Sequence, residues 1–308
     1  MKPKIVVILG PTATGKSDLA VKLAKKLART KWGGFNGEVI SADSRQVYKG
    51  MDLGTGKITK KEMCGVPHHM LDIVSPKSTY NVSKYKIKAQ KIIADILKRN
   101  KLPIICGGTG FYIDAVVNNI ILPEVPPNLK LRKSLEKKSP AELFTMLKKL
   151  DPNRAQNIDN QNKVRLIRAI EIAMELGKVP PCQKDQIYNP IFIGLDLPDL
   201  ELKERIRTRL KRRLKAGLVA EVIYLYKQGI SYRKLESFGL EYRNCALFLQ
   251  NKITKKEMIS KLEKEIWHYA KRQRTWFKRN KKIIWLKAGG GGIGPPTAVL
   301  ETAVMPLN

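Results

Sequence analysis

The chain has 308 residues, 43% of them hydrophobic, which excludes a disordered protein and leaves room for one large or two modest domains. Its 59 lysines and arginines outnumber 27 aspartates and glutamates, giving a formal net charge of +32. Because so much like charge destabilises a compact state, we expect a polyanionic partner, the alternative being a basic surface that binds none.

Membrane spans and disulfide frameworks are not expected. No apolar run is long enough to cross a bilayer, and the one after Met1 is too short for a signal peptide. The four cysteines lack the paired spacing of a zinc site or a disulfide framework: Cys64, Cys106, Cys182 and Cys245. We therefore expect a cytoplasmic protein with no membrane partner, and a monomer.

Short β-rich runs alternate with periodic, lysine-rich helical stretches over much of the chain. The expected strands are 5–9, 38–41, 103–106, 190–197 and 282–286. Helices expected at 17–29 and 83–99 separate several of them. Near-continuous apolar strands that alternate with helices are typical of βαβ units. The sequence therefore predicts an α/β fold with a parallel sheet flanked by helices.

The strand signal stops between residues 120 and 190. A proline-rich entry is followed by helical patterns at 141–150 and 163–176. We interpret residues 120–186 as a helical insertion domain within a discontinuous catalytic core of residues 1–119 and 187–287. The glycine-rich end, 288–308, cannot bury enough surface to offset its ordering entropy and is predicted to be a flexible tail.

A complete Walker A pattern follows the first expected strand and opens the first expected helix: Gly10-Pro11-Thr12-Ala13-Thr14-Gly15-Lys16-Ser17. These residues are predicted to bind a diphosphate, because the backbone N–H groups of such a loop wrap a phosphate chain. In this motif Lys16 is expected to reach the outer phosphate, and Ser17 can ligate Mg²⁺. The motif leaves the ester open: a nucleoside triphosphate is the default occupant, and any diphosphate ester presents similar oxygens.

The acid that Walker B ATPases place after a later strand is not found after 103–106, which runs into Gly107-Gly108-Thr109-Gly110. A carboxylate appears instead after the second expected strand, at Asp43. Strand ends of an open parallel sheet line the ligand crevice, so Asp43 should face the phosphate loop. Its position leaves three roles open: metal ligand, general base and helix cap.

These motifs and several further blocks resemble the tRNA dimethylallyltransferases, also called tRNA isopentenyltransferases. The similar blocks fall in the order of that family and span most of the chain: 10–17, 40–52, 66–73, 107–112, 165–171, 217–222 and 269–277. The resemblance implies a P-loop NTPase-like core whose helical insertion domain grips the anticodon stem-loop of a tRNA.

The resemblance also implies a reaction. The dimethylallyl group of dimethylallyl diphosphate moves to the N6 amine of the adenosine 3′-adjacent to the anticodon, position 37, with Mg²⁺ as cofactor. Asp43 is the implied base, and Lys16, Ser17 and Thr109 are further catalytic candidates. The base must first be flipped out of the anticodon loop. A Gly-Tyr-Lys/Arg motif of the family is loosely matched by Gly239-Leu240-Glu241-Tyr242-Arg243, so Arg243 is expected to be a second cation for the diphosphate.

Candidate tRNA contacts fall in three places. The amide of Gln46 has the chemistry to read an adenine edge, whereas Ser44 and Thr109 could equally make turn and cap hydrogen bonds. The candidates at the crevice, in the insertion and near the chain end are Asp43, Ser44, Arg45, Gln46, Thr109, Arg132, Arg165, Arg168, Lys271, Arg272 and Arg274.

A helix expected from residue 201 carries apolar residues every fourth position, at Leu202, Ile206, Leu210 and Leu214. This spacing predicts one core face and a cationic remainder between 203 and 215, either an RNA contact or a solvated face. His68 and His69 are expected in a loop, and no third ligand near them in sequence supports a zinc site. The rival functions are a small-molecule or nucleotide kinase and a non-catalytic RNA-binding P-loop protein.

Overall fold

The computed structural model describes residues 1–27 and 37–287. The chain divides into two compact units, one made of Met1–Asn119 and the chain from Gln186 onward, the other of Ile120–Asp185. The expected tail at 288–308 lies outside the described residues, as does the end of the helix expected at 17–29.

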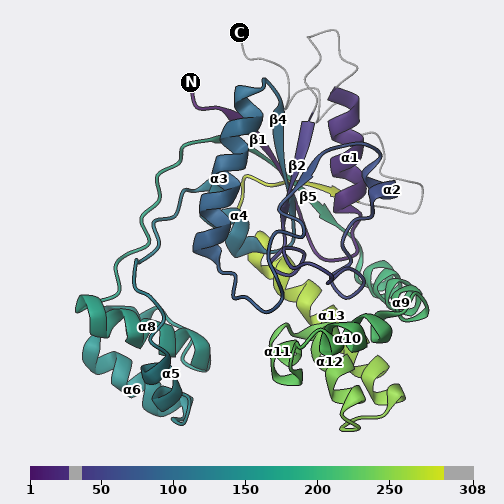
Figure 1. The fold of residues 1–308 in the computed structure, drawn as a ribbon. Helices are drawn as coiled ribbons and strands as arrows, with labels where there is room; N and C mark the ends of the chain where they lie inside the picture. The colour runs from purple at the N-terminus through teal and green to yellow at the C-terminus, as the bar shows by residue number, and fades with distance from the viewer. Residues whose placement is uncertain (28–36, 288–308) are drawn as a thin grey trace. The chain divides into compact units, whose positions relative to one another are not determined.

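The first unit contains a six-stranded sheet in which all neighbouring strands are parallel (Figure 1). The strand order is β3-β2-β4-β1-β5-β6. The strands are β1 (Lys4–Leu9), β2 (Gly37–Ala42), β3 (His68–His69), β4 (Leu102–Gly107), β5 (Asn189–Asp196) and β6 (Ile284–Lys287). The predicted α/β fold is therefore confirmed.

The short strand β3 corrects the sequence analysis, which expected its two histidines in a loop. His68 and His69 pair with Val39 and Ile40 of β2. The ring of His69 also lies 2.7 Å from the buried carboxylate of Glu38. Both histidines thus belong to the sheet edge.

Alternate residues of β1 enter two different cores. Val6 and Ile8 pack against α1 (Lys16–Leu27), in a cluster that contains Leu19 and Leu23. Ile5, Val7 and Leu9 point to the opposite face, which α3 (Val82–Lys98) and α4 (Gly110–Val117) cover. Burial on both faces explains why the strand is a continuous apolar run, as parallel sheets require.

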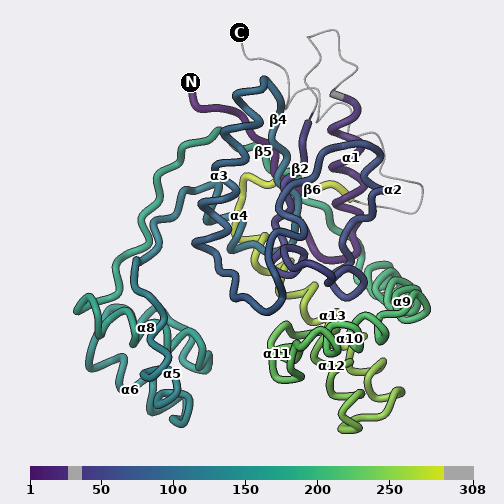
Figure 2. Tube along the Cα trace, viewed as in Figure 1, coloured from purple at the N-terminus to yellow at the C-terminus, as the bar shows by residue number. Residues whose placement is uncertain are grey.

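A group of helices follows β5 around a third core. These are α9 (Asp199–Lys215), α10 (Leu218–Lys227), α11 (Tyr232–Ser237), α12 (Leu240–Leu249) and α13 (Lys255–Phe277); a short helix, α2 (Lys60–Met63), lies earlier in the chain. The long helix α13 runs from this group to the sheet, where Phe277 joins the core of α3 and α4 (Figure 2). The sequence analysis anticipated α9, but not α10, α11 and α12.

The second unit consists of helices in the part of the chain described. They are α5 (Leu129–Leu135), α6 (Pro140–Leu150), α7 (Pro152–Gln156) and α8 (Lys163–Leu176). Leu143, Leu147, Leu166 and Ile170 form the centre of their core. Among all described helices of the chain, none is long and apolar enough to span a bilayer.

Candidate active site

Three loops meet where β2, β4 and β1 end, and these strands are neighbours in the sheet. The phosphate loop follows β1, Asp43 follows β2, and the turn at 107–110 follows β4. Because the strands are parallel, their carboxyl ends lie at one edge, which is where ligands bind in open α/β sheets.

The phosphate loop is stabilised by hydrogen bonds within it, and its backbone conformation requires glycine at position 10. Gly10 has a φ of +142°, and a Cβ there would stand 2.2 Å from the carbonyl oxygen of Leu195. The hydroxyl of Thr14 donates to the Pro11 carbonyl at 2.9 Å, and the ammonium of Lys16 donates to the same carbonyl. Burial lowers the pKa of Lys16 to about 8.

Helix α13 closes against this loop through one buried amide. The side chain of Gln273 accepts a hydrogen bond from the backbone N–H of Thr12 at 2.8 Å and donates to the carbonyl of Gly108 at 2.9 Å. A Cβ on Gly108 would lie 2.1 Å from the Gln273 amide nitrogen, and one on Gly110 would lie 2.2 Å from the Trp276 ring. The glycines of this turn therefore permit the close approach of α13.

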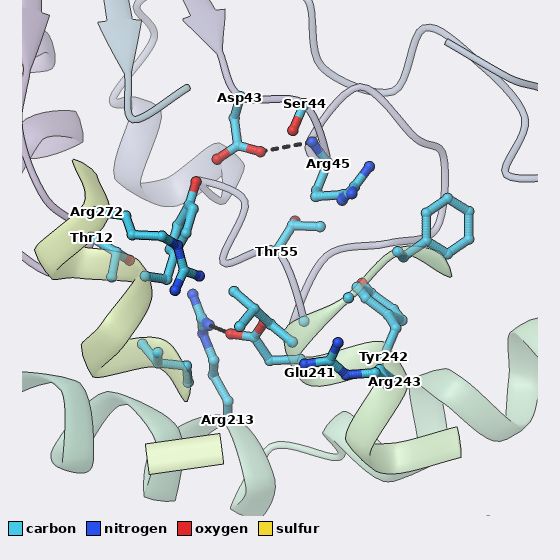
Figure 3. Close-up of a pocket in the computed structure, with 16 residues that line it drawn as sticks. Thr12, Asp43, Ser44, Arg45, Thr55, Arg213, Glu241, Tyr242, Arg243 and Arg272 are labelled. Carbon is cyan, nitrogen blue, oxygen red and sulfur yellow. Dashed lines mark hydrogen bonds and ion pairs between the residues drawn. The ribbon is translucent and has the colours of Figure 1, made fainter. Parts of the chain in front are cut away.

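The carboxylate of Asp43 caps a turn. Its Oδ1 accepts hydrogen bonds from the backbone N–H groups of Arg45 at 2.8 Å and Gln46 at 3.3 Å. The N–H of Ser44 donates to the hydroxyl of Thr109 at 3.1 Å, which ties this turn to the one after β4. The second oxygen of Asp43 points away from the capped N–H groups (Figure 3). The cap role occupies one oxygen and leaves the other available for a reacting group.

A cavity of about 280 Å³ opens beside Asp43. One part of its wall is polar and rich in arginine, and another part is apolar. The lining residues are Thr12, Asp43, Ser44, Arg45, Gly54, Thr55, Arg213, Phe238, Gly239, Leu240, Glu241, Tyr242, Arg243, Ile266, Tyr269 and Arg272. The phosphate loop and the Asp43 turn thus share one cavity.

Two arginines of α9 that the sequence analysis assigned to the cationic remainder between 203 and 215 face inward. Arg209 donates to the hydroxyl of Thr12 at 3.1 Å and to the carbonyl of Gly56 at 3.2 Å. Arg213 lies one turn later and pairs with Glu241 at 3.1 Å. Burial, followed by the charge of Arg213, lowers the pKa of Arg209 to about 10. The interpretation of this face as solvated is therefore wrong at these positions, although Lys203, Arg207, Lys211 and Arg212 are exposed.

A carboxylate of α10, also missed from the sequence, organises the segment 51–56, of which Gly54 and Thr55 line the cavity. Glu221 accepts hydrogen bonds from the N–H groups of Asp52 at 2.9 Å, Leu53 at 2.7 Å and Gly54 at 3.1 Å. The hydroxyl of Tyr242 donates to the same carboxylate at 2.7 Å. The signal available in the sequence was Glu221 within the similar block 217–222.

Some residues that were predicted to contact a ligand have partners within the protein. Arg243 lines the cavity, but its guanidinium pairs with Glu265 at 2.8 Å. The amide of Gln46 lies 2.9 Å from the Ser41 hydroxyl and donates to the carbonyls of Thr55 and Gly56. Arg274 pairs with Asp196 and Asp199, whereas Lys271 and Arg272 are exposed.

Of the three arginines predicted to contact tRNA from the insertion, two are ion-paired within the protein and one is exposed. Arg132 and Arg168 both pair with Glu171, a carboxylate that is only 2% exposed. Arg165 is exposed. Within this unit, Arg132 and Arg168 satisfy a buried charge, and Arg165 alone of the three is open to a ligand.

A magnesium ion fits the loop by the chemistry of its donors. Mg²⁺ binds through one or two protein oxygens together with substrate phosphates, and the exposed hydroxyl of Ser17 lies in the first turn of α1. Among the residues that the structure describes, no group of three or more His, Cys, Asp or Glu could hold a metal. A site shared with a bound diphosphate is compatible with both observations.

The chain matches two family models. The one described as IPP transferase matches residues 46–280, and the one described as isopentenyl transferase matches residues 3–82.

Similar proteins carry one activity in their names. The tRNA dimethylallyltransferase 2 of Treponema denticola is 45% identical over 91% of this chain and 93% of its own length. The tRNA dimethylallyltransferase of Anoxybacillus flavithermus is 40% identical over 92% of this chain and 90% of its own.

Solved structures agree with these relatives. A tRNA isopentenylpyrophosphate transferase from Bacillus halodurans, 36% identical, superposes with a TM-score of 0.72 over 98% of this chain and 95% of that one. A eukaryotic dimethylallyltransferase acting on tRNA, 28% identical, has a TM-score of 0.77 over 93% of this chain and 74% of that one.

Proposed function

The chain belongs to the IPP transferase family of tRNA dimethylallyltransferases, and on that premise we propose the substrates and the chemistry of its site. Dimethylallyl diphosphate is the donor, and the N6 amine of the adenosine 3′-adjacent to the anticodon, position 37, is the acceptor. The observation that carries this proposal is the shared cavity of Thr12, from the phosphate loop, and Asp43. The diphosphate leaving group and the base that accepts the amine proton can therefore lie at the same reacting centre.

The donor side stabilises a departing diphosphate. Negative charge grows on the diphosphate as the allylic C–O bond breaks, so cations already in place lower the barrier. Lys16, the N-terminal amides of α1 and Arg209 supply positive charge around the phosphate loop. Ser17 would hold a Mg²⁺ ion, which when bound would neutralise part of the diphosphate charge.

The acceptor side removes a proton from a weak nucleophile. The lone pair of the adenine amine is delocalised into the ring, so the amine needs a base as the new C–N bond forms. Asp43 is that base: one oxygen is anchored in the turn and the other takes the proton. Thr109 fixes the turn through the N–H of Ser44.

The adenosine reaches this cavity after leaving the stack of the anticodon loop. Arg45 and Arg272 line the cavity and would meet the phosphates of the flipped nucleotide. The exposed side chains of Arg165 and Lys271 would contact the RNA backbone outside the cavity. We further propose a monomer in the cytoplasm, a reducing compartment that suits four free cysteines: Cys64, Cys106, Cys182 and Cys245.

The test is the incorporation of labelled dimethylallyl diphosphate, with Mg²⁺, into an anticodon stem-loop with adenosine at the modification site. The control RNA carries guanosine at that one position. Label entering the adenosine RNA alone is the expected result. Turnover of ATP without label in either RNA would overturn the proposal in favour of a kinase or an ATPase.

A further inference from the structure

Two guanidinium groups lie side by side under the phosphate loop. A Cβ on Gly56 would stand 1.6 Å from one terminal nitrogen of Arg213 and 2.1 Å from one of Arg209. The two side chains leave α9 one turn apart, and Arg209 contacts the Thr12 hydroxyl of the phosphate loop. Gly56 is therefore the residue type that allows both arginines to pack at this point.

The positive charge of this pair exceeds the negative charge that holds it. Arg213 is 9% exposed and is paired with Glu241, which is 8% exposed. The hydrogen-bond partners of Arg209 among the described residues are a hydroxyl and a carbonyl, both uncharged. Burial, followed by the like charge of Arg213, lowers the pKa of Arg209, as expected when buried like charges destabilise one another. An anion bound beside them would relieve this repulsion.

We propose that Arg213 is a second diphosphate-binding cation beside Arg209 and that Glu241 positions it there. This inference rests on the proposed function, because the anion is the diphosphate of the donor. A phosphate of the flipped nucleotide has the same oxygens, and the experiment below separates the two sources. Figure 3 shows Arg213 and Glu241 joined within the cavity on whose wall Asp43 also lies.

The geometry also explains why Arg243 is the weaker candidate for this role. The guanidinium of Arg243 pairs with Glu265, and its side chain is 44% exposed, against 11% for that of Arg213. A charge-assisted hydrogen bond gains strength when water is excluded from it. The sequence motif points to Arg243 as the second cation, whereas the structure places the buried guanidinium of Arg213, from α9, at the cavity.

The experiment measures binding of inorganic diphosphate to the full chain by calorimetry without RNA, and then the KM values for donor and RNA. Arg213→Met should weaken diphosphate binding about 10- to 100-fold and raise the donor KM similarly, leaving the RNA KM within about twofold. Arg212→Met removes an equal charge from an exposed position on the same helix and should leave diphosphate affinity within about twofold.

Glu241 is tested by the sign of its effect. Glu241→Leu removes negative charge from the cavity, so a purely electrostatic role predicts tighter diphosphate binding. A positioning role predicts weaker binding, largely restored in Glu241→Gln, which keeps an acceptor for Arg213. Tighter binding in Glu241→Leu would overturn the positioning role.

Folding is controlled by a double variant. Arg213→Met leaves Glu241 buried without its partner, whereas Arg213→Met with Glu241→Leu replaces both charges by apolar groups that can pack. The double variant should unfold thermally near the wild-type temperature and still bind diphosphate weakly. A change confined to the RNA KM would assign Arg213 to an RNA phosphate, and a loss in Arg243→Met that exceeds the loss in Arg213→Met would return the role to Arg243. Weakened diphosphate binding in a chain that transfers no dimethylallyl group would sustain the anion site and refute the proposed function alone.

Discussion

In the proposed mechanism, the two oxygens of the Asp43 carboxylate have different roles, one structural and one chemical. One oxygen caps the turn at Arg45 and Gln46, and the other points away from these N–H groups and would take the amine proton. The substitution Asp43→Asn separates the two, since asparagine retains an oxygen acceptor for the turn and has no basic oxygen.

We predict that Asp43→Asn lowers kcat by about 10²- to 10⁴-fold, the range of general base catalysis, while the KM for the donor stays within about twofold. Steady-state kinetics with the stem-loop RNA, beside a thermal unfolding scan, measure both. Near-wild-type kcat in this variant would reduce Asp43 to a cap.

The ammonium of Lys16 predicts a pH dependence of donor binding. With a pKa of about 8 in the free protein, it is charged below pH 8 and loses its proton above it. A diphosphate binds the charged form, so the Kd for dimethylallyl diphosphate should be flat at lower pH and rise by up to about tenfold per pH unit above pH 8. Calorimetry without RNA between pH 7 and pH 9 measures this. Lys16→Arg is the control, because a guanidinium stays charged throughout; a flat wild-type profile would contradict the assignment.

Residue chemistry was predictable from the sequence where a motif fixes a backbone conformation. Lys16 and Asp43 follow strands, so the position of each at the sheet edge could be inferred before the structure. Arg209 and Arg213 could not be placed in this way. They stand at the i+3 positions after Ile206 and Leu210, so they extend the buried stripe of α9, but periodicity cannot say that a cavity lies under that stripe.

At the scale of elements, the cavity depends on a segment without regular structure. The segment 51–56 is fixed by Glu221 of α10, whose two oxygens accept hydrogen bonds from three backbone N–H groups and the hydroxyl of Tyr242. A Cβ on Gly54 would stand 2.5 Å from the Tyr242 ring, so the wall is also tightly packed there.

We predict that Glu221→Gln costs about 2 kcal/mol of the free energy of unfolding, because a glutamine amide turns its own N–H donors toward these N–H groups. Donor turnover should fall with it, since Gly54 and Thr55 line the cavity. Tyr242→Phe removes the hydroxyl alone and should cost about 1 kcal/mol. Urea unfolding of both variants ranks them, and equal losses would show that the backbone N–H groups contribute little.

Element prediction succeeded where one strand buries both faces and failed where an element depends on its neighbour. The runs that became β1 and β4 are apolar throughout, which is a local property. Strand β3 has two residues, and its pairing with Val39 and Ile40 is imposed by β2. The helices α10 to α12 bury faces against α9, α13 and the loop at Met51, so their packing is tertiary in origin.

At the scale of the whole molecule, the net charge of +32 is expected to strengthen association with RNA. Binding that releases counterions weakens linearly with the logarithm of salt concentration. We predict a slope steeper than about −4 for the stem-loop affinity, as expected for six or more phosphate contacts. Fluorescence anisotropy at a series of KCl concentrations measures it, and a slope near −1 would refute a broad electrostatic interface.

The insertion offers a matched pair of variants. Arg165→Ala removes an exposed cation and should lower the RNA affinity and reduce the magnitude of the salt slope by about 1, without loss of stability. Arg168→Ala leaves Glu171 with one cation fewer and should destabilise the protein by about 1 to 3 kcal/mol. Anisotropy and urea unfolding separate the two effects. Equal loss of stability in both variants would contradict this division.

The hydrogen bond from the Thr12 N–H to the Gln273 side chain, here called the clamp, joins positions 261 residues apart. This separation in sequence has a consequence during translation. At about 5 to 20 residues per second, a ribosome takes roughly 15 to 50 s to add the glutamine after the threonine. For that interval the nascent chain carries its entire Walker A sequence without the side chain that ties it to the neighbouring turn. A message truncated ahead of α13 would encode a complete phosphate-loop motif that lacks this clamp.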